Sequence, residues 1–174
     1  MLIDLYGLLQ EEDGHRTYHP EIEVSEFKTK NTSYSIKEYD IKLSFHNEGK
    51  KHIACKCEGS VVLVIPCDRC LEPVDHKINI DYFKELDMNK SSEEKIAELD
   101  EENYLDGTVF DSEVLIYNEI LVNLPMKVLC RSDCKGICNR CGANLNMGSC
   151  NCDVAELDPR MSKILDIFNQ FKEV

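Results

Sequence analysis

The chain has 174 residues, of which 43% are apolar, and it carries a formal net charge of −13. This length accommodates one ordinary domain or one domain with a small appendage, and the apolar content is enough for a hydrophobic core. The acidic balance argues against a protein that binds duplex nucleic acid mainly through phosphate contacts, because that mode requires a clustered basic surface. A local basic patch and a basic partner are both compatible with it.

The first half of the chain shows the two-residue alternation that is typical of β-strands. The alternation is weak over 21–27 and clear over 34–46, 52–66 and 74–86, with a predicted turn at 47–50 and a candidate bulge at Gly59. The motif CDRC, residues 67–70, then falls at a hairpin tip. These patterns predict an antiparallel β meander or partial barrel.

An acidic stretch follows over residues 87–106, with eight acidic residues against Lys90 and Lys95. Such a composition is typical of a solvated linker, and the alternative is a docking surface for a basic partner.

Two helices are predicted after this stretch. The first covers 111–124, with Asp111 as N-cap and Pro125 as the stop signal, and it has no Lys or Arg, which argues against a DNA-recognition helix. Its predicted core stripe is Val114, Tyr117, Ile120, Leu121 and Leu124. The second covers 158–171, with Asp158 as N-cap.

The predicted fold class is therefore α+β, an antiparallel β meander or partial barrel covered by helices, with a C-terminal Cys-rich zinc knuckle. We expect two parts: a β-rich domain over 1–128, which includes the acidic linker (87–106) and the covering helix (111–124), and a zinc-binding segment with a C-terminal helix over 129–174.

The N-terminal segment MLIDLYGLLQEEDG lacks a basic start, and its apolar run is too short for a signal peptide. No stretch approaches the roughly 20 apolar residues that span a bilayer. We therefore expect a cytoplasmic protein without membrane contact, in which the ten cysteines stay reduced or bind metal.

The densest cysteine pattern lies near the C-terminus. Cys138-Asn-Arg-Cys141 is followed by Gly142, a form that directs two thiolates at one metal, and Cys150-Asn-Cys152 follows after a short loop. The spacing predicts a four-cysteine zinc site, the C-terminal cluster, formed by Cys138, Cys141, Cys150 and Cys152.

Two cysteine pairs remain, and each supplies half of a tetrahedral site. Combined, they form a second predicted zinc site, the hairpin cluster, made of Cys67, Cys70, Cys130 and Cys134. Closing so long a loop costs little additional entropy. In the alternative arrangement Cys130 or Cys134 exchanges into the C-terminal cluster, so the sequence predicts one zinc ion and allows a second.

The CDRC motif also permits a different function, a zinc-stabilised thiol redox enzyme. A redox C-x2-C stands at the start of a helix, whereas here Pro73 and a strand-like segment follow. Cys55 and Cys57 share one face of a strand and are predicted to be buried core residues. No other pattern singles out a catalytic group, so the chain is predicted not to be an enzyme.

Basic residues gather around the predicted metal sites. Lys127, Arg131, Lys135 and Arg140 stand against the single acidic residue Asp133. They are predicted either to neutralise the thiolates or to make a weak contact with RNA.

The segments CDRCLEP, NLP, LCRSDCKGICNRCGANLN, CNC and DPR occur in this order, and together they resemble the YceD-like family of large ribosomal RNA subunit accumulation proteins. The positions that match the family pattern are the four cysteines of the hairpin cluster with Arg69, Leu71, Gly136, Gly142, Asn144, Leu145, Asp158 and Arg160. Ile137 departs from the pattern, in which leucine is more usual. Arg160, in the DPR segment, joins the candidate RNA-binding residues.

The resemblance implies a bacterial, non-catalytic ribosome-biogenesis factor that supports the synthesis, processing or stability of 23S ribosomal RNA. Its implied partner is that RNA or a basic ribosomal protein. Some family members lack the C-terminal cluster but keep a C-x2-C and later ligand-type residues, which favours a site shared by the four cysteines of the hairpin cluster. The oligomeric state is not predicted.

Overall fold

The fold is built mainly from antiparallel strands with few helices. The computed structural model describes residues 1–22, 25–30, 32–90 and 103–152. Its elements are β1 (Leu2–Asp4), α1 (Tyr6–Leu9), β2 (His15–Tyr18), β3 (Glu26–Lys28), β4 (Ser33–Gly49), β5 (His52–Pro66), β6 (Pro73–Asp87), β7 (Leu105–Asp106), β8 (Val109–Asp111) and α3 (Ser112–Val122). The helix predicted over 158–171, with Asp158 and Arg160, lies outside the described residues.

Across the described ranges, the helices are too short or too polar to span a bilayer.

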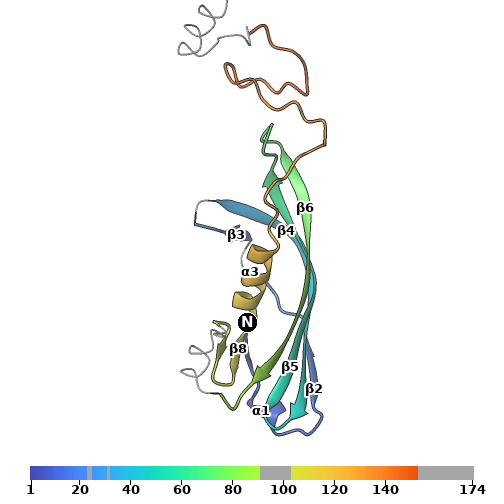
Figure 1. The fold of residues 1–174 in the computed structure, drawn as a ribbon, viewed down its shortest axis with the longest axis vertical. Helices are drawn as coiled ribbons and strands as arrows, with labels where there is room; N and C mark the ends of the chain where they lie inside the picture. The colour runs from blue at the N-terminus through green and yellow to red at the C-terminus, as the bar shows by residue number, and fades with distance from the viewer. Residues whose placement is uncertain (23–24, 31, 91–102, 153–174) are drawn as a thin grey trace, which may run out of the picture.

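Three long strands, β4, β5 and β6, form the antiparallel meander that the sequence predicts. Both β2 and β3 pair with the outer side of β4, which gives a five-stranded sheet in the order β2-β4-β5-β6 with β3 beside β4. The sheet is open and does not close into a barrel. Figure 1 shows that it is long and curved, with the β5–β6 tip next to the cysteine-rich segment.

A second, three-stranded sheet has the order β1-β8-β7. The two flanks of the acidic stretch that was predicted as a linker belong to strands of different sheets. Asp87 ends β6 of the large sheet, and Leu105 and Asp106 form β7 of the small one, while residues 91–102 lie outside the described part of the chain.

The β4–β5 turn lies later than predicted. It consists of Lys50 and Lys51, both with positive φ (51° and 64°), and β4 continues through the predicted turn to Gly49. The strand continues because a register shift between Asn47 and Gly49 keeps it paired past Asn47. Two residues of positive φ match the strand twist in a two-residue hairpin.

Gly59 is not a bulge, which corrects the sequence prediction. It lies in register between Ile41 of β4 and Ile80 of β6. The reason for glycine is the close approach of β4: a Cβ here would collide with the carbonyl oxygen of Asp40, and φ is +151°. Glycine is therefore required at this position by the lack of space for a side chain and not by a change of register.

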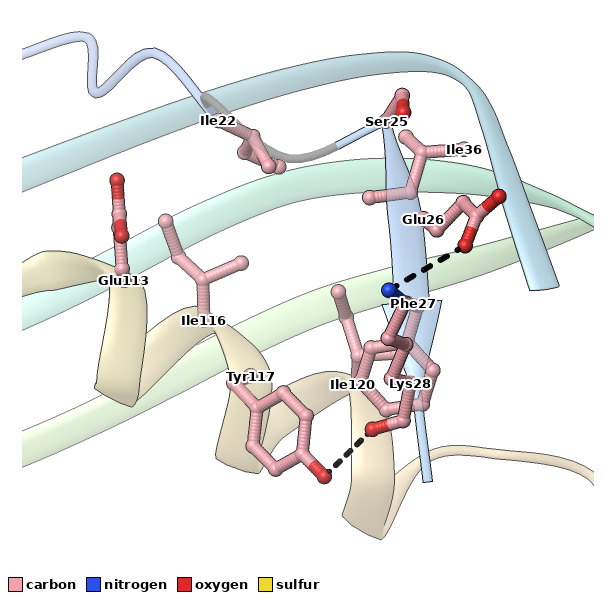
Figure 2. A pocket seen from close by; sticks show the side chains of 10 residues that line it. All are labelled: Ile22, Ser25, Glu26, Phe27, Lys28, Ile36, Glu113, Ile116, Tyr117 and Ile120. Atoms are coloured by element: carbon pink, nitrogen blue, oxygen red, sulfur yellow. Dashed lines mark hydrogen bonds and ion pairs between the residues drawn. The ribbon is translucent and has the colours of Figure 1, made fainter. Parts of the chain in front are cut away.

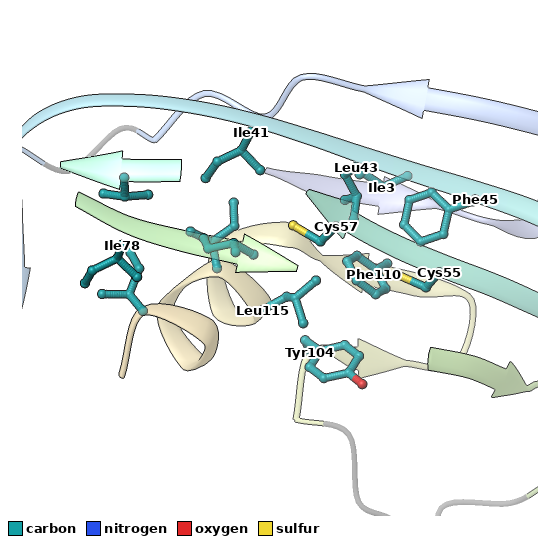
Figure 3. Packing of buried hydrophobic residues seen from close by; sticks show 14 of the residues in the cluster. Ile3, Ile41, Leu43, Phe45, Cys55, Cys57, Ile78, Tyr104, Phe110 and Leu115 are labelled. Atoms are coloured by element: carbon teal, nitrogen blue, oxygen red, sulfur yellow. The ribbon is translucent and has the colours of Figure 1, made fainter. Parts of the chain in front are cut away.

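The hydrophobic core lies on the concave face of the large sheet, where α3 and β8 pack (Figure 1). Phe45 of β4 meets Phe110 of β8 edge to face, with ring centroids 4.9 Å apart, and Tyr104 packs on Phe110 at 5.3 Å. Figure 3 shows Cys55 and Cys57 among these side chains. Both are fully buried, as predicted, and burial raises the pKa of Cys57 to about 12.

Helix α3 begins as predicted. The Asp111 carboxylate accepts hydrogen bonds from the backbone N–H groups of Glu113 (3.0 Å) and Val114 (3.3 Å), which are otherwise unpaired at a helix start. Its core side is formed by Ser112, Leu115, Ile116 and Ile120.

The predicted stripe on this helix is wrong for Tyr117 and Leu121, which are 39% and 47% exposed. Apolar residues surround the helix on nearly all sides, so periodicity alone could not choose the buried face. The orientation of the helix follows from Tyr117, whose hydroxyl donates to the carbonyl of Lys28 on β3 and whose ring packs at a tilt of 33° against Phe27.

Replacing Asn47 tests how the β4 end is fixed. Asn47 is 4% exposed; its amide donates to the carbonyls of Leu8 (3.0 Å) and Glu11 (2.8 Å) and accepts from the Gly49 N–H (2.9 Å). We expect Asn47→Ala to lower the free energy of unfolding in urea by about 2–3 kcal/mol, because it removes three hydrogen bonds of a buried side chain. Asn79→Ala, an exposed position on β6, is the matched control and should change it by less than about 0.5 kcal/mol. Equal effects of the two substitutions would contradict this role.

Candidate metal centres

The four cysteines of the hairpin cluster lie together although they come from distant parts of the sequence. Their sulfur atoms all lie within 4.8 Å of one another. The Sγ atoms of Cys67 and Cys134 are 3.9 Å apart, and those of Cys70 and Cys130 are 3.5 Å apart. Four sulfurs at about 2.3 Å from a tetrahedral metal lie about 3.8 Å from one another, whereas a disulfide requires about 2.05 Å. The spacing therefore fits a metal and not disulfides.

Cys67 and Cys70 lie in the tight turn that connects β5 to β6. The Cys67 N–H donates to the Glu72 carbonyl (2.8 Å), and the Leu71 N–H donates back to the Cys67 carbonyl (2.9 Å). Leu71 adopts a positive φ of 63° and is 64% exposed.

The two middle residues of the CDRC motif bind the segment that carries the other pair. Asp68 exchanges hydrogen bonds with Val128: the Val128 N–H donates to the Asp68 carboxylate (2.6 Å), and the Asp68 N–H donates to the Val128 carbonyl (2.9 Å). The Arg69 guanidinium donates to the Cys134 carbonyl (2.7 Å), and the backbone carbonyl of Arg69 accepts from the Ile137 N–H (3.1 Å). Hydrogen bonds thus align the two halves of the cluster.

Little hydrophobic packing holds this end of the molecule. Among the described residues, its separate apolar cluster has only Cys67, Cys70 and Cys134 as buried members, with Val74, Leu129, Cys130 and Ile137 partly buried around them. In contrast, the main core contains large aliphatic and aromatic side chains from both sheets and α3. A metal bound by the four sulfur atoms would be the strong interaction that stabilises this end of the molecule.

The pKa values of the thiols in the hairpin cluster are shifted in opposite directions. Burial opposes ionisation of Cys67, but N–H groups of Arg69, Cys130 and Cys70 outweigh it and lower its pKa to about 6. Burial raises the pKa of Cys130 to about 12, with a further contribution from the Cys70 sulfur. For Cys70, the N–H of Glu72 favours the thiolate, but burial and the sulfurs of Cys67 and Cys134 raise its pKa.

The C-terminal cluster has the same composition. The sulfur atoms of Cys138, Cys141, Cys150 and Cys152 also lie within 4.8 Å of one another. N–H groups of Cys141 and Arg140 lower the pKa of Cys138 to about 6. Contact with Cys141 and burial raise the pKa of Cys152 to about 12.

The C-x2-C turns of the two clusters share one backbone pattern. In the second turn the Cys138 N–H donates to the Ala143 carbonyl (2.9 Å), and the Gly142 N–H donates to the Cys138 carbonyl (2.9 Å), as Cys67, Leu71 and Glu72 do in the first. Gly142 has φ 71° where Leu71 has 63°. The sequence kinship of CDRC and CNRC therefore reflects two copies of one turn.

The loop of the C-terminal cluster reaches the hairpin cluster. Asn146 donates through Nδ2 to the Cys134 sulfur (3.3 Å), and Asn144 donates to the Glu72 carboxylate (2.8 Å). Sequence reasoning did not single out Asn146, although the Asn-rich loop between Cys141 and Cys150 could have pointed to it. Asn144 and Arg69 were included only through the family resemblance.

The candidate RNA-binding residues differ in their surroundings. Arg131 donates to the Asn146 side-chain oxygen (2.8 Å) and pairs with Asp133 (3.4 Å). Lys127, Lys135 and Arg140 have exposed side chains at the same end of the molecule. Among the five candidates, Arg131 therefore has a structural role. Arg160 lies outside the described residues.

A mainly apolar pocket of about 600 Å³ lies elsewhere, between β3, β4 and α3 (Figure 2). Ile22, Phe27, Ile36, Ile116 and Ile120 supply most of its wall. None of its lining residues is a cysteine or a histidine, so it is separate from both clusters.

The comparisons with known proteins bear on the same segment. A family model with the description "Large ribosomal RNA subunit accumulation protein YceD" matches residues 55–168, which include most of β5, all of β6 and α3, and both cysteine clusters. No solved structure gives a significant match.

Curated relatives match a shorter stretch. An uncharacterized protein of Mycobacterium tuberculosis is 28% identical over 101 residues, which cover 58% of this chain and 48% of that protein. An uncharacterized protein of Mycobacterium leprae is 32% identical over 83 residues, which cover 47% of this chain and 38% of that protein. The chain thus spans about half the length, or less, of the curated relatives it matches.

Zinc binding should release protons at neutral pH. Cys70 and Cys130 have raised pKa values in one cluster, as do Cys150 and Cys152 in the other, so at least two thiols per cluster must lose protons to bind metal. The affinity should therefore fall as the pH is lowered, and more steeply below about 6, where Cys67 and Cys138 also become protonated. Calorimetric titration of the reduced, metal-free chain in buffers of different ionisation enthalpy measures this release. A heat that is independent of the buffer would contradict it.

Leu71 should tolerate glycine. Relief of the left-handed conformation gains about 1–2 kcal/mol, which offsets the loss of about 1 kcal/mol from the freer unfolded chain. We expect Leu71→Gly to keep its metal and to change the free energy of unfolding by less than about 1 kcal/mol. Gly142→Leu is the reciprocal control and should destabilise the C-terminal cluster, as measured by metal release to a chelator. A Leu71→Gly chain that loses metal would mean that the leucine side chain itself supports the turn.

Proposed function

The chain belongs to the YceD family, and from this membership we propose that it is a non-catalytic, zinc-binding ribosome-biogenesis factor that supports the accumulation of 23S ribosomal RNA. The observation that carries the proposal is that the family match includes both four-cysteine clusters and the hairpin that presents one of them. We propose that the protein acts in the cytoplasm, where ribosomes are assembled.

Zinc is the metal proposed for both clusters. All-sulfur donor sets in tetrahedral arrangement select zinc or iron, and C-x2-C turns are typical of structural zinc sites. A site with four protein ligands leaves no open position for substrate, so the metal would stabilise structure instead of reacting. The proposed ligands are the eight cysteines of the hairpin cluster and the C-terminal cluster.

The metals would join two parts of the chain. We propose a β-rich domain over 1–128 and a metal-dependent segment from 129 to 174, connected through the hairpin cluster. Cys67 and Cys70 come from the first part, and Cys130 and Cys134 come from the second. Loss of metal should therefore release the segment but leave the main sheet folded.

RNA contact at the metal-bearing end is the mode that we favour. Lys127 and Lys135 lie on the surface there, on either side of Cys130 and Cys134, and Arg140 lies beside the C-terminal cluster. Two tetrathiolate centres carry negative charge, and these cations are placed to offset it and to contact phosphate groups. Arg131 is assigned to structure because of its bond to Asn146.

A second candidate mode is the binding of a basic ribosomal protein before assembly. The net charge of −13 favours it, and Asp81 and Glu85 on the outer side of β6 are exposed carboxylates on the body. The thiol redox alternative has no such support, since the cysteine pair of each turn lies together with a second pair and the family is described as an accumulation protein.

The favoured mode predicts a defined effect of charge removal. We expect the chain to sediment with large-subunit precursors in a cell lysate and to lose this association after ribonuclease treatment. Lys127→Ala with Lys135→Ala should weaken binding to 23S RNA fragments and lower the salt dependence of log K by about two, one for each lost phosphate contact. Lys42→Ala with Lys77→Ala, exposed lysines of the main sheet, is the matched control.

Two outcomes would contradict this mode. An unchanged salt dependence would place any RNA contact on another surface. Association that resists ribonuclease and follows a basic ribosomal protein would favour the second candidate.

A further inference from the structure

Asn146 connects the two cysteine clusters by a direct contact with a sulfur atom. It belongs to the loop between Cys141 and Cys150 of the C-terminal cluster, yet its amide contacts the hairpin cluster. Nδ2 donates to the Cys134 sulfur at 3.3 Å, and Oδ1 accepts from the Lys135 N–H and the Arg131 guanidinium, both at 2.8 Å.

These partners determine the orientation of the Asn146 amide. Lys135 N–H and the guanidinium of Arg131 are both donors, so the oxygen must face them. The NH2 group therefore faces the Cys134 sulfur, where it can stabilise a thiolate. Groups that hydrogen-bond to metal ligands change metal affinity by about 10- to 100-fold when they are lost.

Further hydrogen bonds hold the loop in this position. Asn144 donates to the Glu72 carboxylate at 2.8 Å, and the Leu145 N–H donates to the Gly136 carbonyl at 2.9 Å. The Asn146 N–H is itself fixed by the Asn144 side-chain oxygen at 2.9 Å. The loop thus contacts the Cys134 sulfur on one side and Glu72, two residues after Cys70, on the other.

The ends of this loop are the metal ligands of the other cluster. Gly142 follows Cys141 directly, and Ser149 precedes Cys150, so a metal bound there closes the loop and restricts Asn146. Without that metal, holding Asn146 at Cys134 would cost the entropy of ordering an open loop.

Resting on the proposed zinc binding, we propose that the two metal centres are coupled through Asn146, so that zinc in the C-terminal cluster tightens zinc in the hairpin cluster. By linkage, zinc in the hairpin cluster must tighten the C-terminal site by the same factor. At limiting zinc the hairpin cluster would accordingly be occupied to a greater extent when the loop is closed.

The test is a double-mutant cycle on the full chain with zinc affinities measured by chelator competition. Asn146→Ala should weaken the hairpin site about 10-fold or more. Cys138→Ser with Cys141→Ser, which removes the C-terminal site, should weaken the hairpin site by a similar factor. In that background Asn146→Ala should have little further effect, because the loop is already open.

Matched variants and a spectroscopic readout separate coupling from general damage. Asn139→Ala, an exposed asparagine in the neighbouring turn, should leave the hairpin site unchanged. With cobalt in place of zinc, Asn146→Ala should move the sulfur-to-metal charge-transfer band of the hairpin site to longer wavelength, since loss of the hydrogen bond raises the energy of the sulfur electrons. Asn146→Asp keeps the acceptor for Lys135 and Arg131 but faces Cys134 with an anion, so it should weaken the site at least as much.

The outcomes distinguish the proposals. Two bound zinc ions with additive effects in the cycle, or an Asn146→Ala chain with unchanged affinity and spectrum, would overturn the coupling and leave zinc binding intact. A chain that binds no zinc would overturn the coupling together with the metal assignment.

Discussion

The convergence of four sulfur atoms in the hairpin cluster is the interaction on which the arrangement of the metal-bearing end depends. It joins Cys67 to Cys134 and Cys70 to Cys130, pairs that are 67 and 60 residues apart in the sequence. The other contacts across this junction are a few hydrogen bonds, each with a net contribution of about 1 kcal/mol. Structural zinc contributes on the order of 10 kcal/mol, so the metal would dominate the energetics of this end.

The metal-bearing end and the main sheet differ in how much hydrophobic packing stabilises them. Phe45, Phe110 and the side chains around them supply the main sheet with a core of its own, whereas residues 125–152 contribute almost no large buried side chain. The β meander therefore has a core of its own, and its tip presents two of the four cysteines of the hairpin cluster. The proposed metal would connect the exposed lysines near that cluster to the sheet.

Much of the fold follows from the sequence, because its signals are local. Two-residue alternation predicts β4, β5 and β6, and Asp111 predicts the start of α3. Periodicity could not find which face of α3 is buried, because apolar residues surround the helix. The orientation of the helix follows instead from the contact of Tyr117 with β3. The role of Gly59 was likewise hidden, since it depends on the closeness of Asp40 on a neighbouring strand.

The candidate site shows the same division. Cysteine spacing predicts two groups of four, and the structure brings together the same two groups, while zinc binding stays a prediction. The outer hydrogen bonds could not be predicted in this way. Asn146 lies 12 residues from the sulfur it contacts, and no periodic pattern connects it to Cys134.

X-ray absorption at the zinc edge, on protein purified without added metal, tests the central claim most directly. The account predicts two zinc ions per chain, each with four sulfur neighbours at about 2.3 Å and no nitrogen or oxygen ligand. Zinc with nitrogen or oxygen ligands, or protein without a zinc absorption edge, would contradict it.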